Sequence, residues 1–157
     1  MQKHLVPLLC LTLVLSTTGF ANFVALIPEF SDLWSLSNSE AGWISGIYLV
    51  GYVIAVPILA GSTDRVDAKR VYLLSAVIGL ISAFGFAYFA EGFWTAITFR
   101  FLYGIAMAGT YIPGLQILND RLDEPRRIRA VPWYTASFGL GTGASYILTG
   151  YVIGVLE

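Results

Sequence analysis

The amino-acid sequence predicts an all-α integral membrane protein, with about five transmembrane helices in a single domain over residues 1–157. Its composition is 57% hydrophobic and 12% charged, whereas about a quarter of the residues of a soluble domain are charged. Five apolar runs are long enough to cross a hydrocarbon layer about 30 Å thick. The runs are continuously apolar, without the two-residue alternation of a barrel strand. Helices are therefore predicted, because they satisfy their own backbone groups without water.

The first predicted span covers residues of about 5–27. Lys3 and His4 precede its apolar stretch, so a cleavable signal peptide is the alternative interpretation. The uncharged stretch continues to Ile27, which is long for a signal peptide and suits a membrane span. Cys10 is the single cysteine and His4 the single histidine. These counts exclude a disulfide framework and a Cys/His metal cluster, so neither a metal nor another cofactor is expected.

The second and third spans cover residues of about 41–61 and 71–90. Ser37 and Glu40 have the spacing of a capping box, which predicts that the second helix begins at the membrane surface. A short polar break with five charges separates the two spans and predicts a tight hairpin at the opposite surface. Asp67 is expected to cap the third helix, because aspartate is a preferred N-cap residue.

The fourth and fifth spans cover residues of about 93–118 and 130–155, and a basic amphipathic linker over residues 119–129 joins them. Arg100 is the one formal charge inside the predicted spans. A charge at the centre of a span costs about 2.5–3.5 kcal/mol on insertion scales. Arg100 is therefore expected to face an interior cavity or a partner. It either ties helices together through carbonyls and hydroxyls, or contacts an anionic substrate or a proton-coupled carboxylate.

The distribution of basic residues predicts the orientation of the chain. Threading five spans places eight of the nine on one side, namely Lys3, Arg65, Lys69, Arg70, Arg121, Arg126, Arg127 and Arg129. By the positive-inside rule this side is the cytoplasm, so the N-terminus is expected in the cytoplasm and the protein in the cytoplasmic (inner) membrane. The opposite loops carry acidic residues and no Lys or Arg. The basic loops therefore indicate topology, and the expected partner is the lipid bilayer rather than a nucleic acid.

Two further groups of residues inside the spans are candidates for function or packing. Thr18 and Asn22 lie four residues apart and would share one face of the first helix, where they could bond a neighbouring helix or a ligand. Small residues recur at helical spacing, as in Gly104 with Ala108. Such spacing predicts that helix backbones approach each other closely.

A second small pair, Gly139 with Gly143, lies in the fifth span and predicts close packing for the same reason.

Tyr103 lies on the fourth span, three residues after Arg100. Its amphipathic ring is a candidate wall for a cavity, or alternatively an interfacial anchor.

The polar break between the second and third spans carries a motif made of Gly61, Asp64, Arg65, Asp67, Lys69 and Arg70. It resembles a loop of the major facilitator superfamily of secondary transporters. In that family the loop has a glycine, three residues, Asp-Arg, one residue, a glycine and two basic residues. Here Gly61 lies one place late, and Asp67 replaces the second glycine. The resemblance implies that the loop acts in gating, through contacts between the two halves of a transporter.

The fourth span adds a second match. Arg100, Tyr103 and Gly104 are similar to a family pattern of an arginine, three residues and a glycine that is linked to proton coupling. In the fifth span Gly139 and Gly143 lie in the region of an antiporter signature, but Ala144 replaces its proline, which weakens an assignment to drug export. Arg100 and Tyr103, together with Thr18 and Asn22, are the residues expected to act in substrate binding or proton coupling. Gly104, Gly139 and Gly143 are expected to act in helix packing.

The resemblance implies transport of a small solute by alternating access, with or without proton coupling. Family members have two six-helix halves, so the chain is expected to be the amino-terminal part of a transporter, partnered by a missing C-terminal half or a second chain. The alternative is a non-transporting five-helix membrane scaffold or assembly partner. An intramembrane enzyme is not expected, because it needs clustered acids, histidine or cysteine near an interface.

Overall fold

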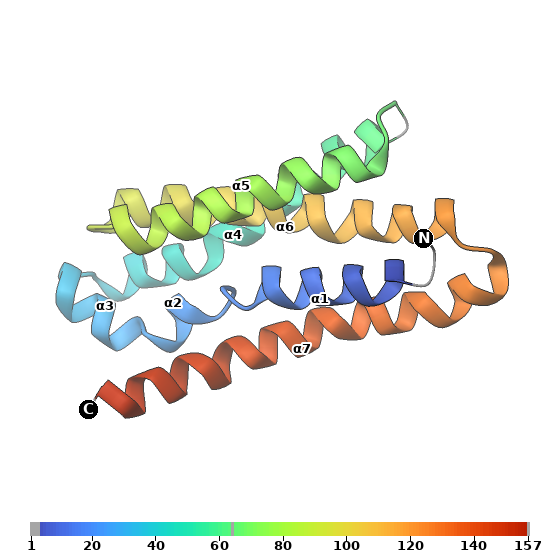
Figure 1. The fold of residues 1–157 in the computed structure, drawn as a ribbon. Coiled ribbons are helices and arrows are strands. Elements are labelled where there is room, and N and C mark those ends of the chain that lie inside the picture. Colours follow the sequence, from blue (N-terminus) through green and yellow to red (C-terminus); the bar gives the residue numbers. More distant parts are fainter. Residues whose placement is uncertain (1–3, 64, 157) are drawn as a thin grey trace.

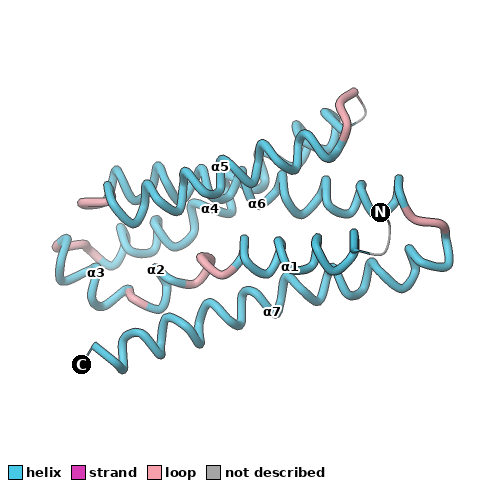
Figure 2. The backbone as a smooth tube through the Cα atoms, viewed as in Figure 1, coloured by secondary structure: helices cyan, strands magenta, loops and turns pink. Residues whose placement is uncertain are grey.

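The structure, a computed structural model, describes residues 4–63 and 65–156, and this part of the chain is built of helices and short connections without strands (Figures 1 and 2). Five of its segments are long and apolar enough to cross a membrane, which confirms the predicted integral membrane fold. The helices are α1 (Leu5–Thr17), α2 (Asn22–Ala25), α3 (Ile27–Trp34), α4 (Asn38–Thr63), α5 (Ala68–Phe89), α6 (Phe93–Arg121) and α7 (Glu124–Leu156).

Helix α6 is the central element of the bundle. Helices α4 and α5 pack mainly against α6, and α1 lies between α6 and α7 and contacts both (Figure 1). In the most hydrophobic stretch of α6, 61% of the residues are buried, compared with 17–28% in the other four spans. The residues that α6 presents on each side therefore decide how the other spans pack.

Glycines allow the backbones of α4 and α6 to touch. A Cβ added at Gly104 would collide with the carbonyl of Tyr48, and one added at Gly51 would collide with the carbonyl of Phe101. Both obstacles are backbone atoms, which cannot rotate away. Gly104 therefore lies at a close helix crossing, as small residues in membrane helices commonly do.

The fifth span packs through a different glycine from those predicted. Gly139 and Gly143 have no atom within 4 Å of an added Cβ in the described part of the chain. Gly141 lies between them in sequence and faces α1, where a Cβ would collide with Thr17 and Val14. The spacing correctly indicated a stretch of small residues in this span. Gly141, however, lies about half a turn around α7 from Gly139, so the contact with α1 falls on the side opposite to Gly139 and Gly143.

The first predicted span, over residues of about 5–27, is confirmed as a segment able to cross a membrane, Leu5–Ala25, but it is not one continuous helix. Helix α1 ends at Thr17 and α2 begins at Asn22, with irregular backbone between them. Helix α1 has 13 residues, about 20 Å of rise, so the interruption falls within a hydrocarbon layer about 30 Å thick. Thr18 and Asn22 consequently do not share a face of one helix.

The other spans begin or end beyond the predicted limits, because hydropathy marks only the apolar part of a helix. The predicted capping box is present. The hydroxyl of Ser37 accepts a hydrogen bond from the Glu40 amide at 3.3 Å, and the Glu40 carboxylate accepts one from the Ser37 amide at 2.8 Å. Helix α6 ends at Arg121 and α7 begins at Glu124, so all of the basic linker expected over residues 119–129 is helical except Leu122 and Asp123.

An aromatic cluster closes the end of the bundle where α3 lies. Phe30 stacks on Phe23 and on Trp34, with ring centroids 5.4 and 4.6 Å apart, and Phe86 of α5 meets Phe30 edge-to-face at 5.9 Å. Helix α3 was not predicted, because its Glu29 interrupts the apolar pattern. Its aromatic side chains anchor α3 over the ends of α2 and α5.

Large apolar side chains cover much of the outer surface. Leu15, Ile58, Leu74 and Ile147 are examples, each more than 60% exposed. In water such a surface would mark an interaction site or an aggregation hazard. On a bundle of membrane-spanning helices it is the surface that contacts lipid or further protein.

The Gly104 crossing predicts a specific loss of stability. Changing Gly104 to Ala forces α4 and α6 apart, and overpacking of this kind costs about 1–3 kcal/mol. The melting temperature of the purified protein in detergent should fall clearly. Gly139→Ala is the matched control, because its Cβ meets no atom within 4 Å, and it should leave the melting temperature nearly unchanged. Equal effects of the two variants would contradict the close crossing.

Candidate functional site

Arg100 lies inside the bundle, seven residues after the start of α6 and about 10 Å along its axis. Its side chain is 4% exposed, which confirms the expectation that it faces the interior. The guanidinium donates one hydrogen bond, from Nη1 to the carbonyl oxygen of Phe20 at 3.0 Å. Its central carbon lies 5.4 Å from the ring centroid of Phe23 and 5.7 Å from that of Phe86. The attraction between the guanidinium and these aromatic faces offsets part of the free-energy cost of removing the charge from water.

The interruption between α1 and α2 is held by side chains of α6 and α7. Tyr103 donates its hydroxyl proton to the carbonyl oxygen of Ser16 at 2.7 Å, one turn along α6 from the bond between Arg100 and Phe20. Ser145 of α7 accepts a hydrogen bond from the amide of Ala21 at 3.0 Å. Irregular backbone at membrane depth requires such partners, because lipid offers none.

Asn22 forms a polar junction with α7. Its Oδ1 accepts one hydrogen bond from the Ser145 hydroxyl and another from the Thr149 hydroxyl, both at 3.0 Å. Thr18 instead donates to Val14 of its own helix at 2.8 Å. The structure thus brings Asn22, Arg100 and Tyr103 together around the interruption and leaves Thr18 outside this network.

Ser145 and Thr149 were missed as site residues. Their spacing of four places them on one face of α7, a pattern typical of hydroxyl groups that bond a neighbouring helix. The spacing of these two residues could therefore have identified them as candidates from the sequence. Which residue they bond, however, is decided by the approach of α7 to α2.

A cavity of about 110 Å³ lies beside Arg100, between the interruption and helices α5 and α6. Its lining includes Asn22, Phe23, Phe86, Arg100 and Tyr103. The Nε and Nη2 groups of Arg100 have no hydrogen-bond partner within the described residues. Because buried polar groups are normally paired, a guanidinium with two unpaired donors is the clearest chemical feature of this cavity.

Two larger hollows flank it. One of about 340 Å³ lies between α1, α5 and α6 and includes Thr12, Ser16 and Tyr72 in its lining. The other, of about 420 Å³, lies against α4, α6 and α7, where Tyr48 and Tyr111 contribute to its wall. Within the described residues, no three His, Cys, Asp or Glu side chains come close enough together to hold a metal ion.

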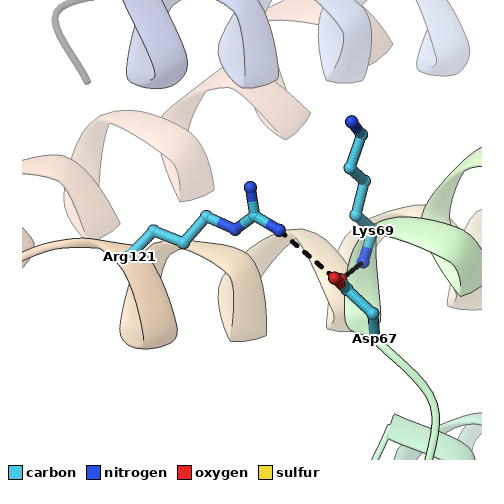
Figure 3. A network of polar contacts seen from close by, with 3 residues as sticks. All are labelled: Asp67, Lys69 and Arg121. Atoms are coloured by element: carbon cyan, nitrogen blue, oxygen red, sulfur yellow. Dashed lines mark hydrogen bonds and ion pairs between the residues drawn. The ribbon is translucent and has the colours of Figure 1, made fainter. Parts of the chain in front are cut away.

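The polar loop between α4 and α5 makes a contact with the end of α6 that the sequence did not reveal (Figure 3). Asp67 caps α5 as predicted, since its Oδ1 accepts a hydrogen bond from the Lys69 amide at 2.8 Å. Its Oδ2 lies 3.4 Å from Nη2 of Arg121, at the end of α6. Figure 3 shows the ammonium group of Lys69 pointing away from this carboxylate. Asp67 therefore joins the α4–α5 loop to the last turn of α6.

The other described residues of the loop motif lie at the surface. Arg65, Lys69 and Arg70 are exposed, and a Cβ added at Gly61 would meet no atom within 4 Å. Asp64 lies outside the described residues. Exposed basic side chains are free to contact lipid head groups or another part of a larger protein.

Comparison with known proteins agrees with this architecture. Residues 9–157 match the sequence pattern of the Major Facilitator Superfamily. The chain is 35% identical to the D-xylose transporter of Levilactobacillus brevis over 81 residues, which are 50% of this chain and 18% of that protein. It is 30% identical to the class B tetracycline resistance protein of Escherichia coli over 126 residues, 80% of this chain and 31% of the relative.

A third relative is the multidrug resistance protein MdtL of Shewanella oneidensis, 26% identical over 117 residues, or 73% of this chain and 28% of the relative. The chain thus spans between about a fifth and a third of the length of these curated relatives.

The five spans define a polytopic α-helical membrane protein with a charged side chain buried inside it. The chain belongs to the Major Facilitator Superfamily, and what it provides is an amino-terminal portion of that fold.

The bond from Tyr103 to the interruption predicts a local effect. In Tyr103→Phe the Ser16 carbonyl loses its partner inside the membrane, at a cost of about 1–3 kcal/mol. Hydrogen exchange measured by mass spectrometry should become faster over residues 16–22. Tyr88→Phe, which alters an exposed tyrosine of α5, is the control and should leave exchange there unchanged. Unaltered exchange in Tyr103→Phe would contradict the assigned role.

The two functions of Asp67 can be separated by two substitutions. Asp67→Asn keeps an N-cap acceptor and removes only the exposed ion pair with Arg121, so the melting temperature should fall slightly, by less than about 1 kcal/mol in stability. Asp67→Ala also removes the cap, which costs about 1 kcal/mol more. Thermal unfolding in detergent provides the comparison. Equal losses in both variants would show that the cap contributes nothing.

Proposed function

We propose that the protein is a secondary carrier that moves a small solute across the membrane by alternating access. The observation that carries this proposal is Arg100, a buried cation with two unpaired donors beside an interrupted span. Ionisable groups at membrane depth are costly and typically mark substrate or ion pathways. Interrupted helices at the same depth expose backbone groups to a binding site in many transporters.

The relatives support transport of small solutes, since they include a D-xylose transporter and proteins of tetracycline and multidrug resistance. The relatives are considerably longer than this chain. We therefore propose that the working carrier pairs these helices with a second helical half, either in the same polypeptide or in a second chain. The carrier itself performs no enzymatic step.

Two roles for Arg100 follow from its surroundings. In one, the guanidinium binds an anionic group of the solute. In the other, it pairs with a carboxylate of the second half whose protonation couples transport to a proton gradient. Tyr103 and Asn22 hold the backbone and α7 around it in either case.

The cytoplasmic loop has a proposed gating role. Asp67 and Arg121 already join α5 to α6 at this surface, and Arg65, Lys69 and Arg70 remain exposed. Contacts from these side chains to a second half would favour one end of the transport cycle. The asymmetry of basic residues supports an inner-membrane location with this loop and the N-terminus in the cytoplasm.

Transport assays in proteoliposomes test the proposal. A panel of D-xylose, tetracycline and small carboxylates should include at least one solute that accumulates under an imposed proton gradient or exchanges across the membrane. Arg100→Gln should reduce this transport about tenfold or more, because a charge-assisted hydrogen bond is worth about 1.5–3 kcal/mol. Arg129→Gln, which removes the same charge from an exposed position of α7, should transport normally.

The comparison of two assays distinguishes the roles of Arg100. If Arg100 acts in proton coupling, Arg100→Gln loses accumulation but retains solute exchange. If it binds solute, both activities fall and the KM for the solute rises. Normal transport by Arg100→Gln would exclude both roles. Absence of transport for every solute in the wild-type protein would favour a membrane scaffold instead.

A further inference from the structure

The orientation of the Asn22 amide provides information beyond the burial of Arg100. Ser145 accepts the Ala21 amide proton with its oxygen, so its own hydroxyl proton is available to donate to Asn22. Thr149 donates to the same Oδ1 atom. Two donors on one side of the amide assign Oδ1 to α7, and the Nδ2 group of this exposed side chain makes no hydrogen bond within the described residues. Asn22 also lines the cavity beside Arg100.

The cavity consequently has donors without matching acceptors. Arg100 contributes Nε and Nη2, and Asn22 contributes the two N–H bonds of its amide. The hydroxyl of Ser82, which also lines the cavity, donates to the carbonyl of Phe99. No acidic side chain lines the cavity within the described part of the chain.

The other walls restrict the size and character of an occupant. Phe23, Phe86 and Phe99 supply aromatic surface around the cavity. The volume of about 110 Å³ suits a group of only a few heavy atoms, since one water molecule takes up about 30 Å³ in the liquid. A ligand here must therefore be small, carry at least two acceptor atoms and present a short apolar part to the rings.

We propose that Arg100 and Asn22 form a binding site for a small carboxylate, either a short-chain acid or the carboxylate end of a larger solute. A carboxylate offers two oxygens to the fork of an arginine and accepts a further bond from the amide. Ser145 and Thr149 act as positioning residues, because their hydrogen bonds to Oδ1 fix the orientation of the Asn22 amide. The inference rests on the proposed carrier function and assigns a chemical class to its solute.

Saturation-transfer NMR on the purified protein in detergent tests this site, with acetate as the probe. Acetate should give a saturable signal, whereas acetamide and methylammonium, of similar size but neutral or cationic, should not. Benzoate should bind more weakly than acetate, because its ring exceeds the cavity. Arg100→Gln should weaken acetate binding about tenfold or more, and Arg129→Gln should leave it unchanged.

Two variants of the second donor keep the test valid if Arg100→Gln does not fold. Asn22→Asp places a carboxylate beside Arg100 and should abolish acetate binding. Thr149→Val removes one of the two bonds that orient the amide and should weaken binding severalfold, although Thr149 does not line the cavity. Equal binding of acetate and acetamide, or normal acetate binding by folded Arg100→Gln or Asn22→Asp protein, would overturn the proposal.

The binding and transport assays separate the two proposals. Transport of a neutral solute without any saturable acetate binding would disprove the carboxylate site and leave the carrier function intact. Acetate binding that depends on Arg100 and Asn22, without transport of any solute, would support the site and disprove the carrier function.

Discussion

The constraint on which the structure depends is that lipid cannot bond to a polypeptide backbone. Where the first span is interrupted between Thr17 and Asn22, backbone groups lose their helical partners at membrane depth. Arg100 and Tyr103 of α6 donate to two carbonyls at or beside this segment, and Ser145 of α7 accepts from one of its amides. The interruption therefore requires α6 and α7 on either side of it, which places α1 between them.

Helix α6 serves two kinds of contact because its faces differ. Gly104 lets the α4 backbone touch that of α6, while Arg100 and Tyr103 reach α1 and the interruption. Tyr103 and Gly104 are consecutive residues and point about 100° apart around the helix, so a short stretch presents a glycine to one neighbour and a polar group to another. The same helix thus carries both the close crossing with α4 and the buried cation, and its packing against α4 keeps the cation in position.

The two ends of the bundle are stabilised by different chemistry. At one end Phe23, Phe30 and Phe86 pack together, and Phe23 and Phe86 also lie against the guanidinium of Arg100. At the other end Asp67 and Arg121 join the α4–α5 loop to the last turn of α6 in a solvated environment, where the ion pair contributes little energy. One end of the bundle is therefore aromatic and the other is charged and solvated, a difference that fits the proposed alternating access.

The sequence by itself determined the class of fold, the five spans, the capping residues Ser37 and Asp67 and the burial of Arg100, because each follows from local hydropathy, helix geometry or the cost of a charge in lipid. Only the tertiary structure decided where the first span breaks, that Gly141 rather than Gly139 meets α1, and that Asn22 bonds Ser145. These features depend on contacts between residues 80 or more positions apart. No local pattern records such contacts, because any neighbouring helix could have supplied the same hydrogen bonds.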